Sequence, residues 1–135
     1  MNVVFAARIS ATLFAVVALF QIALILGAPW GSLTQGGSHS SSLPATGRVI
    51  AVVSAVLVIL MALVVLARVG EGPFTSLSST TLNIAFWITL AYTGLAVLMN
   101  LVSRSVPERL LWVPVTVALF ACLIVVAVGT RTRAG

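Results

Sequence analysis

The segment "MNLVSRSVPERLLWVP", residues 99–114, gathers charged and hydrogen-bonding side chains in a chain that has few of them. Arg104, Glu108 and Arg109 fall within six residues, and Asn100 precedes them by about one helical turn. Guanidinium groups bind carboxylates and phosphates through paired, charge-assisted hydrogen bonds. A site of this composition would suit a small amphipathic or anionic ligand.

The same residues also have a structural explanation. Residues 105–108 fit the S-x-x-E capping box, in which a serine caps the following helix and the glutamate bonds back to the serine N–H. Pro107 suits the first turn, and Glu108 suits the positive end of the helix dipole. Arg104 could pair with Glu108, or could bond the carbonyls that end the preceding helix. From the sequence, the structural and ligand-binding interpretations both stay open.

The composition is typical of a protein surrounded by lipid. Of the 135 residues, 61% are hydrophobic and 7% are charged, whereas a water-soluble domain carries roughly 25% charged residues. A chain of this length cannot bury so much apolar surface in a core of its own. The net charge of +5 comes from seven arginines against two glutamates. Because the arginines are scattered near the ends of apolar runs, we expect no nucleic-acid partner.

Four apolar runs predict an all-α membrane protein, a four-transmembrane-helix bundle in a single domain. Each run of roughly 19 to 25 residues can cross a hydrocarbon core of about 30 Å as a helix. Helices are favoured because backbone groups in lipid must be hydrogen-bonded within their own segment. Ser78, Ser79 or Thr80 can cap the third helix. The expected helices are at about 3–27, 48–68, 80–103 and 106–129.

Helices that alternate in direction place the first and third loops on one face of the membrane. The first loop, residues 27–47, is rich in Gly, Ser and Pro. Side chains at this end could form a ligand site with an aromatic wall, or the indoles could serve only as interface anchors. The candidate ligand-binding residues are Trp30, Arg48, Asn100, Arg104, Glu108, Arg109 and Trp112.

The sequence offers little for catalysis or metal binding. It has no Asp for a catalytic triad and no Lys for Schiff-base chemistry. Glu71 and Glu108 fall on opposite membrane faces, so they cannot act as a carboxylate pair. His39 and Cys122 are the only residues of their kinds and cannot complete a zinc site. We therefore predict no catalytic residue, no metal site and no cofactor.

Two of the helices carry residues suited to contacts between helices. Gly47, Ala51 and Ala55 form a small-residue seam at the start of the second helix, which allows close backbone approach. A polar stripe on the third helix runs through Thr93 to Asn100 and could bond across helices or line a polar pathway. The second and third helices are thus the expected contact surface for a second copy or another membrane protein.

Two stretches of the sequence carry a resemblance. "LGAPWG…GG…LP…R", residues 26–48, followed by residues 99–114, is similar to a group of small, uncharacterised bacterial four-helix integral membrane proteins. The likeness covers nearly the whole chain and implies no particular activity. It points to the turn at residues 28–31 and to the segment 100–112 as the places where function would reside. Small multidrug-resistance transporters have a similar size, but their first helix contains an essential Glu that is absent here.

The sequence therefore gives two functional hypotheses. The first is a non-enzymatic accessory or binding module that contacts the lipid bilayer and a partner protein. The alternative is a small-ligand binding or transport protein with a polar site where the first and third loops emerge.

The arginines also give an expectation for orientation. Four of them, Arg8, Arg68, Arg131 and Arg133, fall on the side of the termini, and three fall on the other side. Because positive charge favours the cytoplasmic side, we expect a multi-pass protein of the plasma membrane with cytoplasmic termini.

Overall fold

The computed structural model describes residues 1–131, which form four α-helices and contain no strand. The helices are α1 (Val3–Ile25), α2 (Ala45–Arg68), α3 (Ser79–Leu101) and α4 (Val106–Arg131). Each is long and apolar enough to cross a membrane. The prediction of an all-α bundle with four transmembrane helices is confirmed, and the chain is an integral membrane protein.

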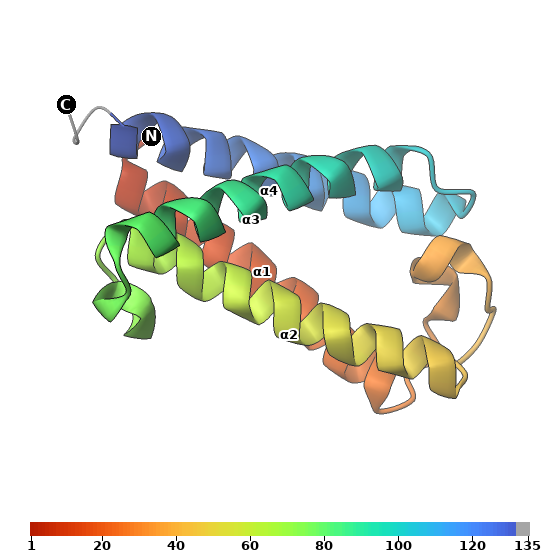
Figure 1. The fold of residues 1–135 in the computed structure, drawn as a ribbon. Coiled ribbons are helices and arrows are strands. Elements are labelled where there is room, and N and C mark those ends of the chain that lie inside the picture. The colour runs from red at the N-terminus through yellow and green to blue at the C-terminus, as the bar shows by residue number, and fades with distance from the viewer. Residues whose placement is uncertain (132–135) are drawn as a thin grey trace.

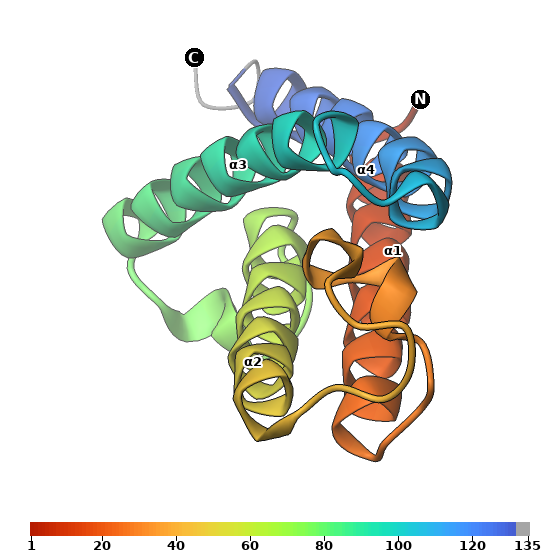
Figure 2. The same ribbon diagram turned by 90° about the vertical axis from the view of Figure 1, so that its right-hand side faces the viewer.

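The helices form two pairs that diverge toward one end of the molecule. Figure 1 shows α3 and α4 above α1 and α2, with the gap between the pairs widening toward the first and third loops. Figure 2 views that end, where α2 stands well apart from α3. At the other end α2 and α3 meet, and Arg68 Nη2 donates a hydrogen bond to Asn83 Oδ1 at 3.1 Å. The first and third loops therefore lie at the open end of the bundle.

Capping residues and glycines set the ends of the helices. Ser78 caps α3, since its side chain accepts a hydrogen bond from the Thr81 N–H at 3.1 Å. α1 ends at Ile25, two residues earlier than predicted, because Gly27 adopts a φ of +100° that a helix cannot continue through. α2 begins at Ala45, about one turn earlier than predicted, directly after Pro44.

Short 3-10 turns complete the connections. The first loop contains η1 (Gly31–Leu33) and η2 (Gln35–Gly37), and the loop between α2 and α3 contains η3 (Pro73–Ser76). The third loop has only a few residues between α3 and α4, as the capping signature at residues 105–108 predicted.

The main core fills the closed end of the bundle and draws on all four helices. Phe86 of α3 is fully buried there, with Val65 of α2 and Leu123 of α4 also inaccessible. The Arg68 guanidinium carbon lies 5.5 Å from the centroid of the Phe86 ring, which adds a cation–π contact. A smaller cluster at the open end includes Leu24. Most of the tightly packed core thus lies away from the first and third loops.

The small-residue seam of α2 lies inside the chain. Gly47, Ala51 and Ala55 are all buried, and Ala51 packs in the small cluster with Leu24 of α1. A side chain added at Gly47 would come within 3.1 Å of the first loop. The seam serves contact with α1 and the first loop. The packing of these three residues is thus used within the chain, and contact of α2 and α3 with a second copy or another protein stays a prediction.

Arg8 and Glu71 form the only ion pair in residues 1–131, at the closed end of the bundle. Arg8 Nη2 lies 2.6 Å from Glu71 Oε1, and Arg8 Nε lies 3.2 Å from Glu71 Oε2. The hydrogen bond from Arg8 lowers the pKa of Glu71 below its usual value. The ion pair links the start of α1 to the loop between α2 and α3.

This pair predicts a small dependence of stability on pH. A carboxyl group whose pKa is lowered by folding stabilises the protein above its unfolded pKa, and that contribution is lost as the pH falls through the lowered value. We expect the melting temperature in detergent to decrease by a small amount once the pH drops below about 4.3. In Glu71→Gln, the part of this decrease that comes from Glu71 should be absent. Because the pair is exposed, salt should weaken the effect. An identical pH profile for wild type and Glu71→Gln would contradict the assignment.

Candidate ligand cavity

The start of α4 is capped as predicted, but with one change of partners. The Ser105 hydroxyl oxygen accepts a hydrogen bond from the Glu108 N–H at 3.3 Å, which confirms Ser105 as the cap. The Ser105 N–H donates to the Ser103 hydroxyl oxygen at 3.2 Å, and the Ser103 hydroxyl donates to Glu108 Oε2 at 2.5 Å. The expected direct bond between Glu108 and the Ser105 N–H is wrong, because the Ser103 hydroxyl is inserted between them.

Of the three candidate arginines, two bind backbone carbonyls near the helix ends and one is exposed. Arg104 is exposed, and in residues 1–131 no ion pair joins it to Glu108, so the expected pair is wrong. Arg109 Nη1 donates to the Ser103 carbonyl at 3.0 Å, and thus takes the carbonyl-binding role expected of Arg104. Arg48 Nε donates to a first-loop carbonyl at 3.0 Å. The guanidinium groups of Arg48 and Arg109 thus bind loop carbonyls.

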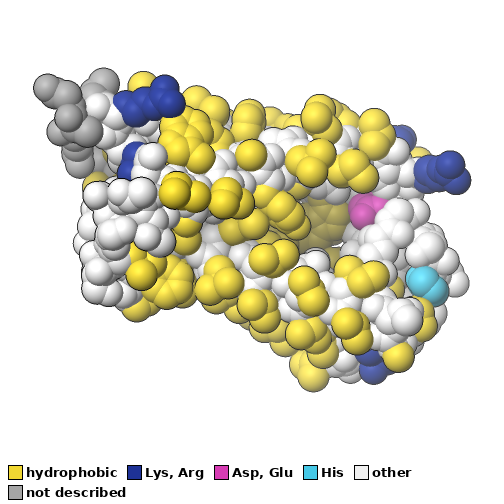
Figure 3. All heavy atoms as spheres, in the orientation of Figure 1, with side chains coloured by type: hydrophobic (Ala, Val, Ile, Leu, Met, Phe, Trp, Pro, Cys, Tyr) yellow, Lys and Arg dark blue, Asp and Glu magenta, His cyan; other side chains and the backbone are white. Residues whose placement is uncertain are grey.

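A cavity of about 180 Å³ lies among the four helices, on the side of the main core that faces the first and third loops. Figure 3 shows a hollow between the two helix pairs, with an acidic side chain at its edge. Much of the wall is apolar and includes Phe14, Val58 and Leu119. The polar residues of the lining include Gln21, Thr34, Ser54, Tyr92, Asn100 and Glu108.

Three of the seven predicted ligand-binding residues line this cavity, namely Asn100, Glu108 and Trp112. Trp30 does not, since its indole stacks on Phe20 with the ring centroids 5.7 Å apart and stays 43% exposed. Arg48, Arg104 and Arg109 also lie outside the lining. The structure thus brings together the amide, the carboxylate and one indole of the predicted set, and leaves out its positive charges.

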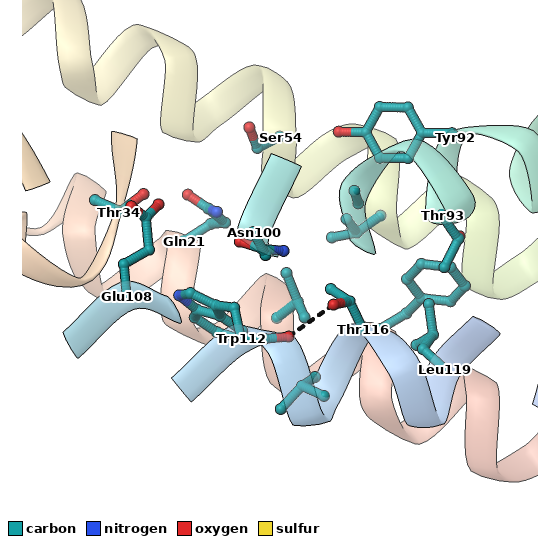
Figure 4. Close-up of a pocket in the computed structure, with 15 residues that line it drawn as sticks. Gln21, Thr34, Ser54, Tyr92, Thr93, Asn100, Glu108, Trp112, Thr116 and Leu119 are labelled. Atoms are coloured by element: carbon teal, nitrogen blue, oxygen red, sulfur yellow. Dashed lines mark hydrogen bonds between the residues drawn. The ribbon is translucent and has the colours of Figure 1, made fainter. Parts of the chain in front are cut away.

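Five polar side chains of the cavity make no hydrogen bond to the protein in residues 1–131: Gln21, Thr34, Ser54, Tyr92 and Asn100. Figure 4 shows them on facing walls, with Gln21, Ser54 and Asn100 around the centre. Polar groups in apolar surroundings are costly unless they find a partner. The cavity therefore presents unmet hydrogen-bonding capacity, which water or a ligand would satisfy.

A second cavity, of about 330 Å³, adjoins the first on the side of the loops. It lies between Gln35 and Gly36 of the first loop and the end of α3. Asn100 and Glu108 line both cavities, so they stand at the neck between them. An amide and a carboxylate therefore lie where the inner cavity adjoins the cavity on the loop side.

The first loop is fastened over this end by two hydrogen bonds from α4 and its cap. The Ser105 hydroxyl donates to the Ser32 carbonyl at 2.6 Å, and the Trp112 indole N–H donates to the Leu33 carbonyl at 2.7 Å. Thr34 follows directly in the chain and lines the cavity. The position of Thr34 against the cavity is thus set by residues more than seventy positions away.

The cavity residues that were not predicted as site residues include Gln21, Ser54 and Tyr92. Each is a polar side chain within an apolar run, in the half of the helix that lies toward the first and third loops. That shared depth is the signal by which the sequence could have identified them. Single polar residues in membrane helices usually face other helices or a cavity.

Comparison of the chain with family models, curated proteins and solved structures gives no match. The resemblance to small bacterial four-helix membrane proteins accordingly stays a prediction.

Proposed function

We propose that the protein binds a small amphipathic molecule in the cavity between its four helices. One observation carries the proposal: polar side chains with unmet hydrogen-bonding capacity converge on a cavity of about 180 Å³ with apolar walls. An apolar cavity of about 150 Å³ takes up benzene, so there is room here for a benzene-sized body with a polar group. Small-molecule sites in general combine apolar walls with a few placed polar groups.

The position of the small residues supports ligand binding over an accessory role. A partner-facing seam was the main argument for an accessory subunit, and Gly47, Ala51 and Ala55 are buried within the chain. A dry, closely packed interior would suit a scaffold, whereas a cavity that reaches Asn100 suits a ligand.

We also propose that the protein lies in the plasma membrane with its termini in the cytoplasm. Arg8, Arg68 and Arg131 lie at the end of the bundle that holds the N-terminus. Arg133 follows them in sequence and lies outside the described residues. Three arginines lie at the opposite end, and the small excess favours the terminal side as the cytoplasmic one. The first and third loops, and the end of the cavity that Glu108 lines, would then lie toward the outer face.

The test fills the cavity with a larger side chain. Ala96 lines the cavity, and Ala91 lies on the exposed face of the same helix, so Ala96→Phe and Ala91→Phe form a matched pair. Radiolabelled benzyl alcohol serves as the probe, in equilibrium dialysis against protein in phosphatidylcholine nanodiscs. We expect wild type and Ala91→Phe to retain the probe above the lipid background, and Ala96→Phe to fall to that background. Equal retention by all three proteins would overturn the proposal, because uptake into lipid is the same for each.

A further inference from the structure

Glu108 is a buried carboxylate without a cationic partner. The residue is 8% exposed, and the only ion pair in residues 1–131 joins two other residues at the far end of the bundle. Oε2 accepts the hydrogen bond from Ser103, and no protein donor within those residues bonds to Oε1. A carboxylate that is shielded from bulk water gains from an added cationic or hydrogen-bonding partner. Oε1 therefore offers an acceptor to a donor group in the cavity, from a ligand or from water.

The surroundings of Glu108 suit a donor of several hydrogen bonds. Thr34, which is also 8% exposed and whose hydroxyl makes no hydrogen bond to the described chain, lines the cavity at the same end (Figure 4). Asn100 shares the neck with Glu108. A carboxylate, a hydroxyl and an amide oxygen together offer acceptors for the three N–H groups of an ammonium ion.

The deeper part of the cavity suits the apolar remainder of such a ligand. Phe14, Trp112 and Leu119 contribute to its wall, and an indole ring near a cation adds a favourable cation–π interaction. An anionic ligand would find no positively charged side chain in the lining, since none of the three nearby arginines lines the cavity. The one formal charge that the cavity presents is negative.

An organic cation fits this arrangement better than a bare metal ion. In residues 1–131 no group of three or more His, Cys, Asp and Glu side chains could hold a metal. Oxygen acceptors are concentrated at the neck, and the space beyond them has largely apolar walls.

We propose that the ligand is an organic ammonium ion whose charged group lies at the neck beside Glu108 and whose apolar body fills the inner cavity. This inference rests on the proposed function and adds the chemical class of the ligand. It makes Glu108 the residue that determines specificity, while Ser103 holds one of its carboxylate oxygens in place.

The test compares two probes of the same size that differ in charge. Benzylamine is protonated at pH 7 and matches benzyl alcohol in its ring and length, and both are measured by dialysis against phosphatidylcholine nanodiscs. We expect wild type to bind the ammonium form about tenfold more tightly, as a charge-assisted hydrogen bond implies. Glu108→Gln, which still accepts a bond from Ser103, should lose this preference and keep its affinity for benzyl alcohol. Glu71→Gln, the matched loss of the chain's other carboxylate, should keep the preference.

The outcomes separate this inference from the proposed function. Binding of benzyl alcohol by wild type without preference for benzylamine would overturn the inference and leave the proposed function intact. An equal loss of both probes in Glu108→Gln would assign Glu108 a purely structural role and would also overturn it. Displacement of benzylamine by sodium chloride, but not by N-methylglucamine chloride, would assign the neck to a metal ion instead.

Discussion

Replacing Phe86 with Ala is expected to lower the free energy of unfolding by about 3 kcal/mol. The ring is fully buried in the main core, beneath the Arg68 guanidinium and edge-to-face with Trp87 at a centroid distance of 6.0 Å. Truncation leaves a cavity and removes both ring contacts. The unfolded helices stay in lipid, so the transfer of apolar surface from water contributes little and the lost packing dominates. For that reason we expect the lower end of the range known for soluble cores.

The matched control is Phe5→Ala. Phe5 lies on α1 and is 58% exposed on the outer surface of the bundle, so its loss should change the unfolding free energy by about 0.5 kcal/mol or less. Reversible unfolding in mixed micelles, followed by circular dichroism, measures both variants. Similar destabilisation by the two substitutions would mean that Phe86 does not pack as described.

Replacing Gly31 with Ala should displace the first loop and cost about 3 kcal/mol. A Cβ at this position would lie 2.4 Å from the Ser41 carbonyl oxygen and 2.6 Å from the His39 carbonyl oxygen. Both are backbone atoms, so no side-chain rotation can relieve the overlap. The Gly31 N–H also donates to the Ser41 carbonyl at 2.8 Å, and this bond would break as the loop opens. Because Thr34 lies in the same loop, benzyl alcohol binding should fall as well.

Gly36→Ala provides the comparison within the same loop. Gly36 has a φ of +72°, and a Cβ added there would have no neighbouring atom within 4 Å, so Ala meets only the backbone cost of about 1 kcal/mol. Hydrogen exchange of the amides of residues 31–35 would report loop opening directly. If both variants show the same exchange and stability, the close packing around Gly31 is not what holds the loop.

The spans and their caps were predictable because they depend on local sequence. Long apolar runs determine which segments cross lipid, and a serine followed by suitable residues caps the next helix wherever that helix packs. Ser78 and Ser105 were identified on that basis, and both cap as expected. The placement of the first and third loops at one end also follows from alternation of the spans.

The composition of the cavity was less predictable because it depends on how the helices rotate and diverge. A sequence places Arg104 and Glu108 at the same end of the bundle, yet one side chain faces outward and the other is buried. The Ser103 hydroxyl lies between the Ser105 N–H and the Glu108 carboxylate and bonds to both. No sequence pattern predicts this role for a serine. The pairing of Arg8 with Glu71 joins residues sixty-three positions apart and likewise needs the fold.

The hydrogen bonds that hold the first loop end on main-chain oxygens of Ser32 and Leu33. Those oxygens are present whatever amino acid occupies either position, so evolution can alter both side chains without losing the attachment. The donors are the side chains of Ser105 and Trp112, so substitution at either position removes a hydrogen bond. Among diverging descendants of this gene, we expect positions 105 and 112 to be retained together while positions 32 and 33 drift, and a library randomised at 32 and 33 should yield mostly folded clones.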